Sequence, residues 1–257
     1  MTGVLPIALG DSTKIIQAFL HSGKEYVCVM KLHGDAKEDS IKKLMIEFED
    51  EIYQKPPIRS SVKRQLRTRR IYYIDFIEKV ERNVLFKVGC EAGTYIRKLC
   101  YDLGEILGCG AHMQELRRTR AGPFNESQNS FISLYELFYW FSEWKERKDP
   151  DILRKIIQPM EFALELIPKI VVRDSTVDAL CHGANLTAPG VLSIDSIIKK
   201  DSIVAILTLK GEAIALARSL HSSENILEMD HGSVATLQRV LMPRGTYPRV
   251  WRKTSKK

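Results

Sequence analysis

Basic side chains gather between Lys55 and Arg70, where they could bind phosphate groups. This segment holds seven basic residues and no acidic one, and it includes the dipeptide Pro56-Pro57. A solvated surface normally interleaves charges of both signs, so the unbalanced charge favours a polyanionic ligand over an inert surface. The basic residues of this segment are Lys55, Arg59, Lys63, Arg64, Arg67, Arg69 and Arg70.

A second basic cluster, Arg117-Arg118-Thr119-Arg120, stands directly before Ala121-Gly122-Pro123. Neither cluster falls on an amphipathic helix with a large apolar face, so together they favour a nucleic acid over a membrane surface as the partner. The formal net charge of +7 agrees with this interpretation. No stretch approaches the roughly eighteen consecutive apolar residues of a membrane span.

The segment from Cys90 to Leu99 could present catalytic side chains, because a strand ends, a glycine turns the chain and a helix begins within it. Tyr95 and Arg97 follow the glycine. A purely structural interpretation also remains open at this point. In that interpretation Arg97 pairs with Glu91 or Asp102, and Tyr95 packs.

The six histidines are scattered, and none stands at ligand spacing from a cysteine or a carboxylate. Glycine-rich motifs that hold nucleotide phosphates are also missing from the sequence. We therefore expect no metal site and no cofactor, and structural roles for His112 and His182. The pair Asp11-Ser12 is typical of a helix cap rather than of a catalytic acid.

Apolar periodicity predicts mixed helices and strands in the first two thirds of the chain. An aromatic stripe at helical spacing, formed by Leu134, Leu137, Phe138, Phe141 and Trp144, is predicted to pack into a core. The other predicted elements are a helix over 13–21, a strand over 26–32, a helix over 36–51, a hairpin of strands 71–80 and 84–90, a helix through Leu99 to Leu107, and a short helix from Pro150.

From Pro168 onward the pattern changes to short strands, over 191–194, 203–209, 213–218 and 234–242, with a tight turn at 210–212. This change predicts a second, compact and mostly β domain. We place the boundary between the two domains near residues 160 to 168.

Length and composition are those of a globular protein of one large or two smaller domains. The chain has 257 residues, of which 44% are hydrophobic and 28% are charged. These values exclude a disordered tail and a disulfide-dependent mini-protein. The five cysteines form no C-x-x-C pair, so we expect reduced core thiols in an intracellular protein.

Six segments, taken together and in order, resemble the RNA-guided, dyskerin-like branch of the tRNA pseudouridine synthase B family. Its members are catalytic subunits of H/ACA ribonucleoproteins, and the resemblance covers nearly the whole chain. The segments that carry it are Thr2-Gly-Val-Leu-Pro-Ile-Ala-Leu-Gly10, Lys24-Glu-Tyr26, Pro56-Pro57 with the basic segment, Gly93-Thr-Tyr-Ile-Arg97, Met113-Gln-Glu-Leu-Arg-Arg118 and His182-Gly-Ala-Asn-Leu-Thr-Ala-Pro-Gly190.

The resemblance implies an α+β fold with a mixed, largely antiparallel sheet in the catalytic domain, incomplete at its N-terminus, and a small all-β PUA barrel. It implies a catalytic domain over residues 1–167, a PUA RNA-binding domain over 168–246 and a basic tail over 247–257. In this family the PUA barrel holds the 3′ trinucleotide of the guide RNA. The matching residues here are Gly183, Ala184 and Leu186.

The implied reaction is the isomerisation of uridine to pseudouridine, in which the glycosidic bond breaks, the base rotates and it rejoins through C5. By the motif match, Tyr26 stacks on the flipped base and Leu116 forms the apolar wall beneath it. Arg97 pairs with the catalytic aspartate, and Tyr95 lies near C5 as a candidate for proton removal. The basic segment matches the thumb that clamps substrate RNA.

One departure from the family concerns its nucleophile. The aspartate of the motif G-x-x-D-P-x-x-T-G would fall three positions before Met1, because only Thr2-Gly3 of that motif is present. We expect the chain as written not to form pseudouridine, since neither Asp11 nor Glu91 is placed to substitute. An internal methionine taken as the start explains this best, ahead of a deliberate fragment or a natural non-catalytic form.

Two other functions stay open, a non-catalytic RNA-binding scaffold and a stand-alone enzyme that modifies the TΨC loop of tRNA. The guided branch ranks higher because Pro243-Arg-Gly-Thr-Tyr-Pro248 and the His182 segment resemble it more closely. The resemblance implies guide RNA, substrate RNA, a small zinc-ribbon protein, a β-barrel protein of the glycine- and arginine-rich type and a kink-turn-binding protein as partners. It also implies a cytoplasmic enzyme with no membrane partner.

Overall fold

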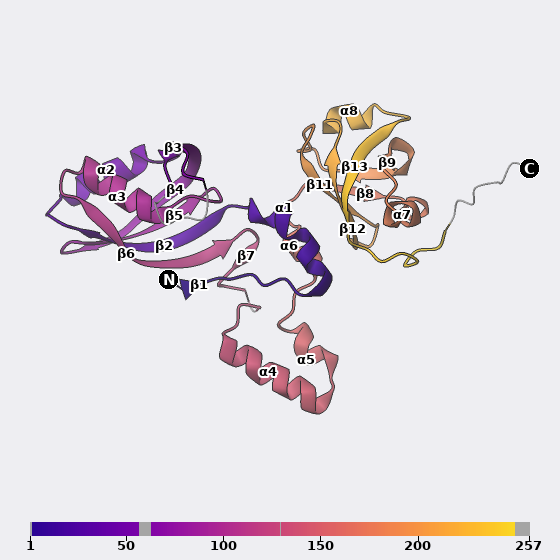
Figure 1. Ribbon diagram of the computed structural model, residues 1–257, viewed down its shortest axis with the longest axis horizontal. Helices are drawn as coiled ribbons and strands as arrows, with labels where there is room; N and C mark the ends of the chain where they lie inside the picture. Colours follow the sequence, from indigo (N-terminus) through magenta and orange to yellow (C-terminus); the bar gives the residue numbers. More distant parts are fainter. Residues whose placement is uncertain (1, 57–62, 129, 250–257) are drawn as a thin grey trace, which may run out of the picture. The chain divides into compact units, whose positions relative to one another are not determined.

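The computed structural model describes residues 2–56, 63–128 and 130–249. The chain forms two compact units. One consists of residues 1–6 and 20–156, and the other of residues 7–19 and 157–257. Each unit has a β-sheet and its own apolar core, so the predicted α+β class is confirmed (Figure 1).

The first unit is built on a seven-stranded sheet in the order β1-β6-β2-β5-β4-β3, with β7 paired to β6. β1 and β6 pair in parallel, and the other strand pairs among the described residues of this sheet are antiparallel, as the resemblance implies. The strands are β1 (Thr2–Gly3), β2 (Lys24–Leu32), β3 (Asp50–Gln54), β4 (Arg67–Val80), β5 (Asn83–Cys90), β6 (Ala111–Ala121) and β7 (Phe124–Asn125).

Two helices, α2 (Glu38–Glu47) and α3 (Ile96–Ile106), cover one face of this sheet (Figure 1). Alternation in β2 turns Cys28, Met30 and Leu32 toward these helices, where all three are fully buried. Burying a side chain of this size contributes about 1.5–3 kcal/mol, so this face fixes the register of β2. The predicted strand, hairpin and helices of this region are therefore confirmed.

Helix α4 (Leu134–Arg147) contradicts the prediction that its aromatic stripe packs into a core. No residue of α4 is buried, and Tyr135 and Phe138 are 89% and 74% exposed. The Ser133–Glu136 capping box explains why a helix begins here, and α5 (Pro150–Arg154) lies beside it. Helical spacing creates an apolar stripe, whereas only non-local packing decides whether the stripe is covered.

The second unit has a six-stranded sheet in the order β10-β8-β11-β12-β13-β9, and its strands include the four predicted ones. The strands are β8 (Lys169–Val172), β9 (Leu186–Thr187), β10 (Val191–Ile194), β11 (Ile203–Leu207), β12 (Ala213–Ser219) and β13 (Ser233–Val240). The helices are η1 (Gly10–Ile15, a 3-10 helix), α1 (Ile16–Leu20), α6 (Met160–Ala163), α7 (Asp174–Cys181), η2 (Ala188–Gly190, a 3-10 helix) and α8 (Ser223–Leu227).

The predicted capping role of Asp11 is wrong. The residue that precedes η1 is Leu9, and the Ser12 hydroxyl donates to the Leu9 carbonyl at 2.7 Å and accepts from its N–H at 2.8 Å. Asp11 lies within the first turn and forms an ion pair with Lys14 at 2.9 Å. A helix therefore begins close to the predicted point, but at Gly10 instead of residue 13 and with Ser12 as its polar anchor.

The cysteines are free thiols, and four of the five are buried. Cys109 is half-buried and packs against the core of the first unit, so it is less buried than the other four thiols. In the part of the chain that the structure describes, no helix has the length and apolar character to cross a membrane. The same residues include no group of three or more histidine, cysteine or carboxylate side chains that could hold a metal ion.

Candidate functional site

The turn between β5 and α3 presents the two residues predicted to be catalytic. β5 ends at Cys90, and Gly93 takes a φ of +83°. Tyr95 stands at the N-cap position of α3 with an extended backbone. The Thr94 hydroxyl donates to the Glu91 carbonyl at 2.8 Å, which closes the turn. The strand, turn and helix predicted for this segment are therefore present.

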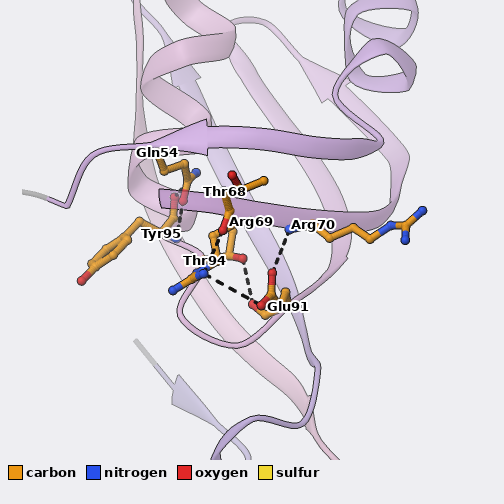
Figure 2. Close-up of polar contacts among 7 residues, drawn as sticks. All are labelled: Gln54, Thr68, Arg69, Arg70, Glu91, Thr94 and Tyr95. Carbon is orange, nitrogen blue, oxygen red and sulfur yellow. Dashed lines mark hydrogen bonds and ion pairs between the residues drawn. The ribbon is translucent and has the colours of Figure 1, made fainter. Parts of the chain in front are cut away.

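Glu91 and Asp102 pair with cations other than Arg97. The Glu91 carboxylate accepts from the Arg70 N–H at 3.1 Å and lies 3.9 Å from Arg69 Nη1 (Figure 2). Asp102 pairs with Lys98. Arg97 is exposed, and among the described residues it forms no ion pair with a carboxylate. The structure therefore does not show the ion pair with Glu91 or Asp102 that the structural interpretation predicts for Arg97.

Tyr26 lies on the helix-covered face of the sheet, opposite Val88 of β5 and Arg118 of β6. Its ring packs against the core that includes Cys28 and Met30. Burial raises the pKa of the Tyr26 hydroxyl above its usual value, while the positive charge of Arg118 opposes that rise. A neutral, partly buried aromatic ring is suited to stack on a base.

Leu116 lies opposite Cys28 and packs against the same core, so it shares this face of the sheet with Tyr26. Lys24 pairs with Cys90, which means that β2 begins where β5 ends and the turn over residues 91–95 starts. The fold therefore brings Tyr26, Tyr95 and Arg97 to one end of the sheet.

Four of the five basic residues predicted to contact substrate RNA are described, three of them outside the strands and Arg67 as the first residue of β4. Lys55, Lys63 and Arg64 are exposed and Arg67 is half-buried, and among the described residues none of the four lies within 4.0 Å of a carboxylate. Arg64 Nε donates to the Pro56 carbonyl at 3.4 Å, and Arg67 Nη2 donates to the Lys63 carbonyl at 3.3 Å. The predicted contact residue Arg59 lies outside the described residues, as does Pro57.

Arg69 and Arg70 belong to β4 rather than to the loop. Each has an acidic partner, because Arg69 lies near Glu91 and Arg70 pairs with Asp50 at 3.2 Å. Among the described residues of this segment, the positive charges without a carboxylate partner are therefore those of Lys55, Lys63, Arg64 and Arg67.

The second basic cluster forms part of β6, a strand that the periodicity analysis did not predict. Arg117 pairs with Glu126 at 2.8 Å, and Arg118 Nε donates to the Val4 carbonyl at 2.7 Å. Arg120 Nη2 donates to the Tyr73 hydroxyl at 3.4 Å. Internal contacts thus engage all three guanidinium groups, and Arg118 is the one placed next to Tyr26.

The predicted guide-RNA residues follow α7 in the second unit. Gly183 has a φ of +91° with open space where a Cβ would stand, and Ala184 is exposed. Leu186 is fully buried in the core of this unit, so its side chain does not face solvent. A hollow of about 360 Å³ adjoins Gly183, and it is lined by Asp11, Lys14, Cys181, His182, Gly183, Val240, Leu241, Met242, Pro243 and Arg244.

Sequence reasoning missed Gln54, the last residue of β3. Its side chain is 1% exposed and contacts the backbone of Tyr95 (Figure 2). A single polar residue at a strand end produces no periodic or motif signal, so only the three-dimensional structure reveals it. Sequence reasoning also missed Lys14 and Arg244 as lining residues of the hollow in the second unit, because single polar residues give no periodic signal.

Comparison with known families defines the class of protein. Residues 1–96 match the N-terminal domain model of TruB family pseudouridylate synthases, and residues 97–165 match the C-terminal domain model of tRNA pseudouridylate synthase B. Residues 168–241 match the PUA domain. The chain thus combines the two domains of a pseudouridylate synthase with a PUA domain.

Individual relatives are similar along almost the entire chain. A probable tRNA pseudouridine synthase B of Methanopyrus kandleri is 51% identical over 98% of this chain and 74% of its own length. The corresponding protein of Archaeoglobus fulgidus is 51% identical over 99% of this chain and 78% of its own length. The chain therefore belongs to the TruB family of pseudouridine synthases.

Solved structures agree with this assignment. The crystal structure of a Cbf5-Nop10-Gar1 complex superposes with a TM-score of 0.92 at 50% identity, covering 96% of this chain and 74% of that one. The structure of an H/ACA ribonucleoprotein bound to a substrate RNA that contains 2′-deoxyuridine gives a TM-score of 0.90 at 47% identity. That match covers 97% of this chain and 75% of the other.

Proposed function

We propose that this protein isomerises uridine to pseudouridine in ribosomal and transfer RNA as the catalytic subunit of an H/ACA guide ribonucleoprotein. The observation that carries the proposal is the match of 96–97% of the chain to solved H/ACA proteins at 47–50% identity. The fold supports it by bringing Tyr26, Tyr95 and Arg97 to one end of the sheet.

In the proposed reaction the uridine leaves its stack and its base lies on the ring of Tyr26, with Leu116 as the apolar wall beneath. Stacking on an aromatic ring is worth about 1–3 kcal/mol per base, which offsets the loss of stacking in the RNA. Tyr95 lies near C5 and takes part in the proton removal that completes the isomerisation. Arg97 holds the nucleophilic carboxylate ionised and oriented.

The nucleophilic carboxylate is not among these 257 residues in the proposed mechanism. Glu91 and Asp102 are engaged by Arg69, Arg70 and Lys98, so neither is available to Arg97. We therefore propose that a polypeptide of these residues alone binds RNA without converting uridine.

The proposed domains are a catalytic domain over 1–167, a PUA domain over 168–246 and a basic tail over 247–257, of which residues 250–257 lie outside the described part. Substrate RNA contacts Lys55, Arg59, Lys63, Arg64 and Arg67 in this proposal. Guide RNA contacts Gly183 and Ala184 beside the hollow, with Leu186 supporting them from the core. We propose cytoplasmic action, with zinc-ribbon, β-barrel and kink-turn-binding proteins as partners.

A turnover assay tests the proposal directly. The 257-residue chain and a version extended at its N-terminus by a segment that completes the motif G-x-x-D-P-x-x-T-G are each assayed with guide RNA, substrate RNA and the partner proteins. We expect pseudouridine only from the extended version. Product from the shorter chain would contradict the absent nucleophile, and no product from either would contradict the proposed function.

A tRNA pseudouridine synthase that acts without a guide RNA is the second candidate, because the curated relatives are named as probable tRNA pseudouridine synthases B. The discriminating measurement is conversion of a tRNA substrate by the extended version with and without guide RNA. Conversion that needs no guide RNA would favour this second candidate.

A further inference from the structure

We infer that Gln54 is a positioning residue for Tyr95, an inference that rests on the function proposed above. Gln54 is the last residue of β3, the edge strand of the first sheet, and its side chain is almost fully buried. Its amide group faces the backbone of Tyr95 at the start of α3 (Figure 2).

The contact has two hydrogen bonds. Gln54 Oε1 accepts from the Tyr95 N–H at 2.9 Å, and Gln54 Nε2 donates to the Tyr95 carbonyl at 3.2 Å. A primary amide that donates and accepts on the same residue fixes the peptide groups on both sides of its Cα atom. The direction in which the Tyr95 side chain leaves the backbone is thereby set.

Tyr95 needs such a contact because α3 has no side-chain cap of its own. Its N-cap residue is Tyr95 itself, whose side chain accepts no capping hydrogen bond. The Tyr95 carbonyl accepts from the N–H groups of Lys98 and Leu99, both at 3.0 Å. Gln54 Oε1 accepts from the N–H of the N-cap residue, a role that a glutamate or glutamine at the third helical position fills in a capping box. That position of α3 is Lys98, which cannot accept, so Gln54 supplies the acceptor from a distant strand.

Gln54 connects Tyr95 to β3, one of the two strands between which the basic segment lies. Gln54 directly precedes Lys55, and on the other strand Arg70 donates from its backbone to Glu91 at 3.1 Å. β3 and β4 therefore hold the turn over residues 91–95 from both ends. Figure 2 shows the Tyr95 ring pointing away from Glu91, with Gln54 above the backbone of Tyr95.

A merely structural role for Gln54 predicts a different outcome from a positioning role. If the amide only satisfies buried backbone groups, its loss lowers stability and leaves the bound base undisturbed. If it positions Tyr95, its loss changes the surroundings of the base at C5 even at temperatures where the protein stays folded.

The test uses a substrate RNA with 5-fluorouridine at the target position, bound to the 257-residue chain with guide RNA. Three proteins are compared, the unsubstituted chain, Gln54→Met and the matched control Gln128→Met. Gln128 forms the same type of contact elsewhere in the first unit, donating to the Pro123 carbonyl at 2.9 Å and accepting from the Asn125 N–H at 3.3 Å. Methionine keeps the length of glutamine and removes both hydrogen bonds.

We expect Gln54→Met to bind RNA within about twofold of the unsubstituted chain, since phosphate contacts dominate affinity. The ¹⁹F chemical shift of the RNA bound to Gln54→Met should lie close to that of free RNA. The RNA bound to Gln128→Met should keep the ¹⁹F chemical shift that it has on the unsubstituted chain. Thermal melting, recorded in parallel, shows that each variant is folded at the temperature of measurement.

An unchanged ¹⁹F resonance in folded Gln54→Met would overturn the positioning role and leave only a structural one. An equal change in Gln128→Met would overturn it as well, because the effect would then not be specific to Tyr95. If binding to the unsubstituted chain leaves the ¹⁹F resonance where it is in free RNA, the proposed function itself fails. A ¹⁹F response in the unsubstituted chain therefore separates the two kinds of failure.

Discussion

Tyr26 is the side chain whose chemistry determines how the base is held in this account. We expect Tyr26→Ala to weaken binding of a flipped uridine by about 1–3 kcal/mol, the cost of losing one stacked base, and Tyr26→Phe to retain the affinity. Titration with a substrate RNA that carries 2-aminopurine beside the target uridine measures this. Equal losses in both variants would show that the hydroxyl, and not the ring, makes the contact.

The cysteines differ in reactivity because their surroundings differ. Burial raises the pKa of the Cys90 thiol to about 11. The hydrogen bond with Cys28 at 3.6 Å, together with burial, raises the pKa of Cys100. Only the thiolate reacts, and Cys109 is the only half-buried cysteine in the described structure.

We therefore expect iodoacetamide at pH 7.5 to modify Cys109 first in the folded protein. Mass spectrometry of the digested protein identifies the modified cysteine at each time point. Early modification of Cys90 or Cys100 would contradict the buried, protonated state inferred for them.

At the scale of secondary-structure elements, a polar network joins β2, β4 and β6 on the face of the sheet opposite Tyr26. Thr119 donates to Glu25 Oε1 at 2.6 Å, and the Tyr73 hydroxyl donates to the other carboxylate oxygen. Burial alone would raise the pKa of Glu25. The two hydrogen bonds, together with the positive charges of Lys87 and Arg120, outweigh burial, so the pKa of Glu25 lies below its ordinary value.

Because the pKa of Glu25 is lower in the folded state, ionised Glu25 stabilises the fold at pH values above its pKa in the unfolded chain, near 4.5. This stabilisation is lost as the pH falls through the pKa of the folded state. We expect Glu25→Gln to be less stable than the unsubstituted chain at pH 7, by about 1 kcal/mol. The difference should shrink below pH 4.5. Urea denaturation at several pH values measures it, and a difference independent of pH would contradict the network.

Periodicity was sufficient to predict β2, the β4–β5 hairpin and α3, because each buries one face against a core. It did not predict β6, since Arg117, Arg118 and Arg120 read as a charged cluster although the strand pairs with β2 along its length. It also assigned α4 to a core that does not cover it. Partners distant in sequence decide both cases, and they leave no local pattern.

For the candidate site, the sequence indicated three residues through motifs but not the buried residue Gln54. Motifs identified Tyr26, Tyr95 and Arg97, and the fold brings their strands and helix to one end of the sheet. Gln54 could not be predicted, because its partner lies on another element. The grouping of residues 7–19 with the second unit also depends on contacts far apart in sequence.

For the molecule as a whole, the net charge of +7 makes binding of RNA depend on salt. If Lys55, Lys63, Arg64 and Arg67 each contact a phosphate, replacing all four by glutamine lowers the slope of log K against log salt by about 3. Affinity measurements at several potassium chloride concentrations provide the slope. A slope unchanged in the variant would place the phosphate contacts elsewhere.

The proposed function requires Tyr26, Tyr95 and Arg97 to surround a single uridine. A crystal structure of the protein with guide RNA and a substrate RNA that carries 5-fluorouridine would show whether they do. We predict that the base stacks on the ring of Tyr26, with C5 next to the Tyr95 side chain and the Arg97 guanidinium on the same side. A base bound elsewhere, or Tyr26 and Arg97 on opposite sides of the unit, would contradict the account.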